Sequence, residues 1–136
     1  MGTCSNIGVQ LEDGTIKAVY CNFDSQLTSN GDTLLSYYDS REKALQILEK
    51  GDMSYLSDTI EKTEYYVDRG EEMIKPRVFQ SVKDYTDMDY NYFFSLEGKW
   101  MVCCLRYNNE PKLLDEAVGD AIERECEISR SRRNRR

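Results

Sequence analysis

Alternating apolar residues on both sides of Asp13-Gly14 place the strongest constraint on how this 136-residue chain can fold. An Asp-Gly pair between two alternating runs is typical of a tight β-hairpin turn. A two-residue turn puts six apolar residues on one face, in the pairs Leu11 with Ile16, Val9 with Ala18 and Ile7 with Tyr20. The opposite face is then polar and carries Gln10, Glu12, Thr15 and Lys17. The sequence therefore predicts a hairpin with one face on a core and the other in water.

Two helical segments are expected after this hairpin. The turn at residues 29–32 leads into Leu34, Leu35, Tyr37 and Tyr38, which predicts a short helix or a helical turn. A longer helix is predicted over 41–50, because Ser40 can cap its start and Gly51 can end it in a left-handed conformation. Its apolar residues recur at helical spacing, namely Ala44, Leu45, Ile47 and Leu48.

The second half of the chain predicts further strands. Residues 64–67 and 77–82 favour short strands, separated by a turn at 68–71. Two apolar runs within 90–105 flank Glu97-Gly98 and predict a second hairpin. A two-residue turn there puts Tyr92, Phe94, Leu96 and Met101 on one face and Phe93, Trp100 and Val102 on the other. A strand pair that is apolar on both faces belongs in the middle of the sheet, or packs against a helix on one face and a partner on the other.

The C-terminal segment predicts an amphipathic helix and a tail. Pro111 suits the first turn of a helix, and Leu114, Val118, Ile122 and Cys126 recur every four residues. The helix is expected to end near Ser129, with 130–136 as a basic tail. No composition break marks a second domain. We therefore expect residues 1–129 to form one α+β domain, with an antiparallel sheet from the two hairpins packed against two or more helices.

Composition narrows the possible chemistry. The chain has no histidine, which excludes histidine-based triads and the common imidazole metal sites. Its five cysteines lack paired C-x-x-C spacing, so we expect buried, reduced thiols, with Cys103 and Cys104 on opposite faces of a strand. Glycine-rich phosphate loops are absent. No catalytic residue, metal or cofactor is predicted, although an enzyme is not excluded.

The sequence also shows neither a secretory signal nor an apolar run near the roughly 20 residues of a membrane span. A cytoplasmic protein without membrane contact is therefore expected. The sequence leaves the oligomeric state open and allows a homo-oligomer.

Charge is distributed unevenly along the chain. The five arginines of 130–136 contribute +5 to a net charge of -7, so residues 1–129 carry -12. Carboxylates interleaved with tyrosines can bind a basic protein surface and can imitate the phosphates of a nucleic acid. An ordinary solvated surface that keeps a small protein in solution is the simpler explanation of the same charges. The predicted partner-binding residues are Asp58, Glu61, Glu64, Tyr65, Asp68, Glu71, Glu72, Asp84, Asp87, Asp89 and Tyr90. Direct nucleic-acid binding is not expected, because a body at -12 repels a polyanion.

An alternative site lies at the end of the first hairpin. Tyr20, Cys21, Phe23 and Asp24 place two aromatic rings, a thiol and a carboxylate within five residues. This segment would serve a small-ligand binder or an enzyme, although the thiol would need a base other than histidine.

Several segments resemble a group of small bacteriophage and prophage proteins. The resemblance rests on Ser5-Asn6-Ile7-Gly8, Asp13-Gly14 and Tyr20-Cys21-Asn22-Phe23-Asp24, followed by Gly31, Leu34-Leu35 and Tyr38, and by blocks at 51–56 and 68–71. It covers about the first 75 residues and departs at Asn22, where the group commonly has histidine. It implies a phage accessory protein in the cytoplasm of a bacterial host, and because the group has no established catalytic residues, it assigns none here.

Charge and resemblance together predict a protein that binds and inhibits a host protein. A stricter version of this prediction is that the host protein binds nucleic acid, which the acidic surface imitates. A structural component of the virion is the other alternative.

Overall fold

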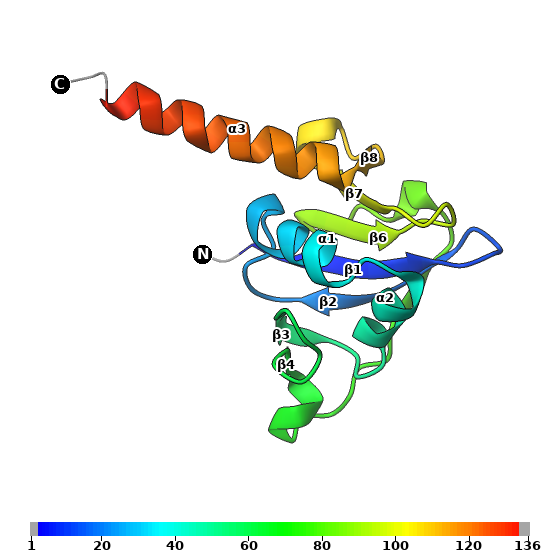
Figure 1. Ribbon diagram of the computed structural model, residues 1–136. Coiled ribbons are helices and arrows are strands. Elements are labelled where there is room, and N and C mark those ends of the chain that lie inside the picture. The colour runs from blue at the N-terminus through cyan, green and yellow to red at the C-terminus, as the bar shows by residue number, and fades with distance from the viewer. Residues whose placement is uncertain (1–2, 134–136) are drawn as a thin grey trace.

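The structure is a computed structural model that describes residues 3–133, the last three as helical backbone only (Figure 1). Its strands are β1 (Ser5–Gln10), β2 (Ile16–Cys21), β3 (Met53–Tyr55), β4 (Glu64–Tyr65), β5 (Arg77–Phe79), β6 (Tyr90–Phe94), β7 (Trp100–Cys104) and β8 (Lys112–Leu113). Its α-helices are α1 (Asp32–Tyr37), α2 (Arg41–Leu48) and α3 (Leu114–Arg133). The strand order is β4-β3-β2-β1-β6-β7-β8, and β5 pairs with β2. The α+β class is confirmed.

The sheet is mixed, so the expectation of a purely antiparallel sheet is wrong. β1 runs parallel to β6, and β2 is parallel to β3 where Cys21 pairs with Met53. The first strand of each hairpin, β1 and β6, pairs with the other, and the two strands point in the same direction. β5, which also returns to the sheet after a long excursion, pairs antiparallel with β2, so the sheet mixes both orientations.

Both hairpins form where they were predicted, but each is out of register by one residue. Asp13-Gly14 lies in a three-residue loop in which the Gly14 amide donates to the Leu11 carbonyl at 2.8 Å, and Gly14 has a φ of 88°. The second hairpin repeats this loop, with the Gly98 amide donating to the Ser95 carbonyl at 3.0 Å. A turn followed by a left-handed glycine adds one residue relative to a two-residue turn.

The shift moves side chains to the opposite face of the sheet. In the first hairpin Ile7 pairs with Val19 and Gly8 with Ala18. In the second, Phe94 pairs with Trp100, so Trp100 and Val102 share a face with Tyr92 and Phe94, and Met101 lies with Phe93 on the other. The predicted placement of Cys103 and Cys104 on opposite faces is confirmed, because each belongs to a different core cluster.

Both faces of the sheet are covered. The helices cover one face, where buried residues of β1, β2, β6 and β7 pack against Leu34, Ile47, Leu114 and Val118. On the other face, residues 77–85 cover a smaller cluster of Ile16, Ala18, Tyr85, Phe93 and Cys103. The prediction of a solvated polar face on the first hairpin is therefore wrong, because this later segment packs against it.

The helices follow the predicted signals in part. The Ser40 hydroxyl accepts a hydrogen bond from the Lys43 amide at 3.2 Å, and Gly51 ends the α2 region with a φ of 81°. The expected strands at 64–67 and 77–82 shorten to β4 and β5, and 3-10 turns follow.

The C-terminal helix differs from its prediction at both ends. α3 begins at Leu114, because residues 112–113 extend the sheet edge as β8, and it continues past Ser129 to Arg133. The predicted tail therefore starts inside α3, and residues 134–136 lie outside the described part. None of the described helices is long and apolar enough to cross a bilayer.

Two glycine substitutions test the packing of β1. A Cβ on Gly8 would lie 2.8 Å from the Lys17 carbonyl oxygen and 2.9 Å from the Ala18 Cβ, whereas one on Gly119 in α3 would meet nothing within 4 Å. We expect Gly8→Ala to lower the free energy of unfolding by about 1–3 kcal/mol. Gly119→Ala should raise it by up to about 1 kcal/mol, because alanine favours the helix. Urea unfolding measures both, and equal stability of the two variants would contradict the close approach at Gly8.

Candidate functional site

The predicted carboxylates all lie at the surface. Asp58 is half-buried and the other eight are exposed. Three of them pair with basic groups of the same chain: Asp68 with Lys50 at 3.2 Å, Glu64 with Arg69 at 3.6 Å and Asp87 with Arg77 at 3.7 Å. Part of the predicted acidic surface is thus neutralised locally, and exposed pairs of this kind contribute little to stability.

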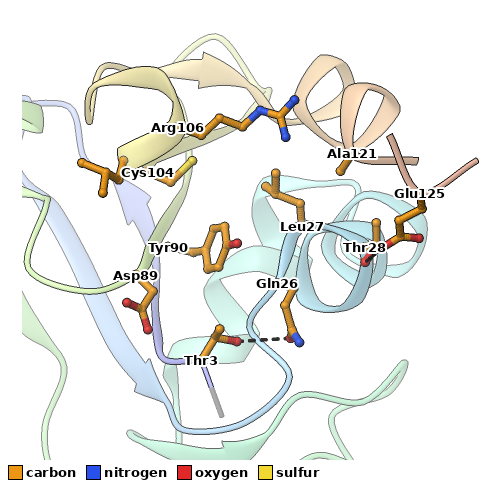
Figure 2. Close-up of a pocket in the computed structure, with 11 residues that line it drawn as sticks. Thr3, Gln26, Leu27, Thr28, Asp89, Tyr90, Cys104, Arg106, Ala121 and Glu125 are labelled. Carbon is orange, nitrogen blue, oxygen red and sulfur yellow. Dashed lines mark hydrogen bonds between the residues drawn. The ribbon is translucent and has the colours of Figure 1, made fainter. Parts of the chain in front are cut away.

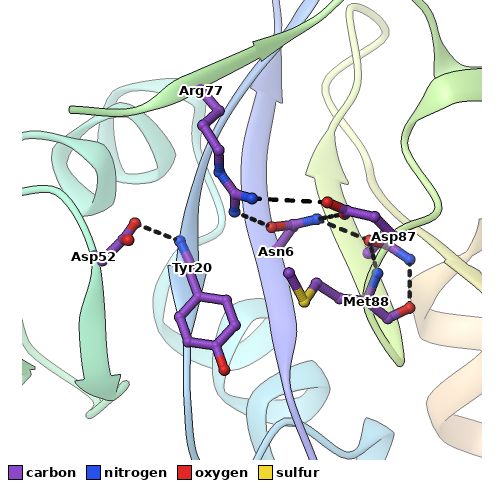
Figure 3. A network of polar contacts seen from close by, with 7 residues as sticks. Asn6, Tyr20, Asp52, Arg77, Asp87 and Met88 are labelled. Atoms are coloured by element: carbon purple, nitrogen blue, oxygen red, sulfur yellow. Dashed lines mark hydrogen bonds and ion pairs between the residues drawn. The ribbon is translucent and has the colours of Figure 1, made fainter. Parts of the chain in front are cut away.

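Asp87 and Asp89 hold their loop against β1. Figure 3 shows the Asn6 side chain between Arg77 and Asp87, donating to Asp87 Oδ1 at 2.5 Å and accepting from Arg77 at 2.6 Å. Asn6 also donates to Asn91 at 3.0 Å, and Asp89 accepts from the Cys4 amide at 3.1 Å. Asp87 thus helps to satisfy the buried Asn6 amide, and Asp89 binds the backbone just before β1, so both carboxylates have a structural role.

The predicted tyrosine anchor Tyr65 is a core residue. Its side chain has no exposed surface, and its hydroxyl donates to the Ile47 carbonyl at 2.8 Å. Tyr85 and Tyr92 are also fully buried. Tyr90 is half-buried and stacks on Tyr92 with ring centroids 6.1 Å apart. Tyr65 therefore cannot contact a partner in this fold, because its ring completes the packing beneath α2.

Alkaline titration tests the burial of these tyrosines. Burial raises the pKa of Tyr65, Tyr85 and Tyr92 above the ordinary value of 10.0. Above pH 10 the tyrosines of the unfolded chain ionise, whereas these three stay protonated in the folded protein. Their contribution to stability is therefore fully present below about pH 10. It is lost as the pH rises through the folded-state pKa. We expect the free energy of unfolding to fall above pH 10. Titration of all ten tyrosines in one step near pH 10 in the folded protein would contradict this burial.

A cleft between α2 and the turn at 58–61 gathers acidic and aromatic side chains. We call it the acidic cleft; its volume is about 360 Å³. The side chains that line it are Tyr37, Tyr38, Lys43, Gln46, Glu49, Asp58, Thr59, Ile60 and Glu61. Two of them, Asp58 and Glu61, were predicted from the sequence. Tyr37 and Glu49 were missed, because only the tertiary fold brings the turn to α2.

The wall of the acidic cleft is fixed by hydrogen bonds. The Tyr38 hydroxyl donates to the Ser57 carbonyl at 2.7 Å, and Thr63 bonds to the Thr59 carbonyl at 2.8 Å. The cationic Lys43 is paired with Asp39 at 3.1 Å. Among the described residues, Glu49, Asp58 and Glu61 have no ion-pair partner, so no basic side chain neutralises their charges within the cleft.

A second depression lies between the turn at 27–31, the end of β7 and α3 (Figure 2). This groove has a volume of about 490 Å³ and contains Asp89 and Tyr90 from the predicted surface. Leu27, Cys104, Leu105 and Ala121 supply apolar surface, and Thr3, Gln26, Thr28, Arg106 and Glu125 supply polar groups. Charges of both signs therefore meet at its rim.

The alternative site at 20–24 is not assembled. The Tyr20 hydroxyl hydrogen-bonds to Cys4 Sγ at 3.0 Å, which raises the Tyr20 pKa to about 12 together with burial. Cys21 points to the helix face, where Asn30 donates to its sulfur at 3.4 Å. Phe23 and Asp24 are exposed beyond the strand end. Neighbouring residues of a strand project in opposite directions, so the thiol and the phenol cannot act on one ligand.

Thiol accessibility checks this arrangement. Burial raises the pKa of Cys21 and Cys104, and raises that of Cys103 to about 12, whereas Cys126 is exposed. Because the thiolate is the reactive form, we expect alkylation of the folded protein at Cys126 first, and at the three buried thiols only after unfolding. Peptide mass spectrometry after timed alkylation measures this order. Cys21 reacting as fast as Cys126 would favour the alternative site.

Within the described residues, no three cysteine, aspartate or glutamate side chains are grouped to hold a metal ion. Comparisons with protein-family models, with curated proteins and with solved structures find no match for this chain.

Proposed function

We propose that this protein binds a basic segment of another protein in the acidic cleft. The observation that carries the proposal is the group of three carboxylates, Glu49, Asp58 and Glu61, beside the half-exposed ring of Tyr37 in one cleft. A lysine or arginine side chain suits this arrangement, because its charge meets the carboxylates while its stem covers the tyrosine ring. The nearest cation, Lys43, is already paired with Asp39.

The charge of the whole protein supports the same partner. The field of residues 1–129, at -12, attracts a basic surface over a longer range than direct contact does. Such attraction raises the association rate and weakens as salt screens it. The carboxylates outside the cleft, such as Glu71 and Glu72, act in this proposal through the field and not as direct contacts.

The resemblance to phage proteins suggests the setting. In this proposal the protein is a phage-encoded accessory protein, its partner is a protein of the bacterial host, and occupation of the partner's basic surface inhibits it. In the stricter form the partner binds nucleic acid, and the carboxylates compete with phosphates for the same cations.

Paired variants of equal charge test the proposal. Glu49→Gln, Asp58→Asn and Glu61→Gln together remove the cleft carboxylates. Glu12→Gln, Glu97→Gln and Glu110→Gln together remove three exposed carboxylates that lie elsewhere. Affinity purification from bacterial host cells should recover the same partner with the wild type and the control, and at least about tenfold less of it with the cleft variant. Binding of the purified partner should weaken steeply with salt.

Three results would contradict the proposal. These are equal recovery by the two triple variants, a partner whose binding is insensitive to salt, and the absence of any reproducible partner at low salt. Addition of duplex DNA separates the two versions, because it displaces a partner that binds nucleic acid and leaves other partners bound. Detection of the protein in purified virions would favour the structural alternative.

A further inference from the structure

The groove of Figure 2 has walls that the fold holds in place. The turn at 27–31 is π-helical, because the Gly31 amide donates to the Gln26 carbonyl, five residues earlier, at 3.3 Å. Gly31 also lets this turn approach α3 closely, since a Cβ there would lie 3.2 Å from Val118 Cγ2 and 3.3 Å from Leu114 Cδ1. Small-molecule sites are commonly preformed in this way, and π-helical turns are frequent at functional sites.

Two hydrogen-bond donors face the groove without a partner among the described residues. The Arg106 guanidinium lies over the Tyr107 ring and has no ion pair, and Figure 2 shows it extending from the turn after β7 towards α3. The same view shows the Tyr90 ring in the middle of the groove. Burial raises the pKa of Tyr90, as do Cys104 and Asp89, whereas Arg106 lowers it, so both charged groups act on this hydroxyl. A guanidinium and a phenol are suitable donors to a carboxylate.

The other charges of the groove oppose a phosphate. Asp89 and Glu125 line it together with Arg106, so the groove carries two negative charges and one positive charge. Asp89 accepts from the Cys4 amide and Glu125 from the Thr28 hydroxyl, but neither has an ion-pair partner in the described part of the chain. A dianionic phosphate would be repelled by both carboxylates. A ligand with one carboxylate and one ammonium group instead pairs with both kinds of charge.

Apolar groups form the rest of the lining. Leu27 and Cys104 are buried, Ala121 is half-buried, and all three line the groove beside Tyr90. A buried thiol behaves as a small apolar group. The volume of about 490 Å³ falls in the range of small-molecule sites, roughly 300–1,000 Å³. The groove can therefore accept an apolar side chain as well as the two charged groups of a ligand.

We propose that this groove binds a small zwitterion with an apolar side chain, either a free amino acid or a short peptide. Arg106 and the Tyr90 hydroxyl hold its carboxylate. Asp89 and Glu125 hold its ammonium group, and the apolar lining contacts its side chain. The proposal does not depend on the acidic cleft, which is formed by other elements, so each site can fail without the other.

Isothermal titration calorimetry with L-leucine and with the dipeptide leucyl-leucine tests the ligand class. At least one of them should bind at a ratio of one to one. Tighter binding of leucine identifies free amino acids as the ligands, and tighter binding of the dipeptide identifies short peptides. The C-terminal amide and the N-acetyl form of each probe lack one charge and should bind at least about tenfold more weakly. Inorganic phosphate should not compete.

Paired variants test the site. Arg106→Gln should weaken binding of the better probe at least about tenfold, and Tyr90→Phe should weaken it severalfold, because each removes a donor to the carboxylate. Arg124→Gln and Tyr55→Phe are the matched controls and should bind like the wild type. Arg124 is exposed on α3 without lining the groove, and Tyr55 is 37% exposed in β3. Urea unfolding confirms that each variant is folded.

Three results would overturn the proposal. The first is the absence of saturable binding by both leucine and leucyl-leucine at millimolar concentration. The second is equal binding by Arg106→Gln and Arg124→Gln. The third is binding of the amide or N-acetyl forms as tight as that of the zwitterions, because the charged groups of the groove would then play no part.

Discussion

The parallel pairing of β1 with β6 is the contact on which the rest of the structure depends. It runs from Ser5 opposite Tyr90 to Val9 opposite Phe94, and it joins two hairpins that lie more than 60 residues apart in the chain into one sheet. Because β2 occupies the other edge of β1, this strand has neighbours on both edges and cover on both faces. Gly8 belongs to this constraint, since a side chain there would meet the backbone of β2.

Buried tyrosines fasten the less regular segments to this sheet. The hydroxyl of Tyr92 donates to the Ser25 carbonyl at 2.7 Å, and that of Tyr85 donates to the Tyr92 carbonyl at 2.5 Å. Tyr65 does the same for the end of α2 through Ile47. A buried phenol requires an acceptor, so each ring fixes both an apolar contact and the position of one carbonyl. Residues 52–89 can therefore fold with little regular secondary structure.

The sequence predicts local features well where one short segment determines them. Asp13-Gly14 and Glu97-Gly98 locate both hairpins, and Ser40 locates the start of α2. The register of each hairpin depends on whether the glycine lies inside a two-residue turn or follows it, and the dipeptide alone does not distinguish these.

The functional surfaces were predicted less well, because their residues are distant in the sequence. Alternation of tyrosine and carboxylate over 58–92 suggests an exposed aromatic surface. The rings of Tyr65, Tyr85 and Tyr92 instead fill the core, whereas most of the acidic residues between them are exposed. The acidic cleft needs Glu49, at the end of α2, beside the turn at 58–61, an arrangement that no local pattern encodes.

The burial of tyrosines and cysteines also explains why the acidic cleft keeps charge that the fold does not neutralise. The interior takes up phenols and thiols, so the acidic residues remain outside, where some find a lysine or arginine nearby, as Asp68 finds Lys50. The acidic cleft carries charge of one sign beyond its Lys43–Asp39 pair, and a second copy of the same cleft would repel it. A basic segment of a different protein is therefore the occupant that our proposal expects in the cleft, because only opposite charge is attracted there.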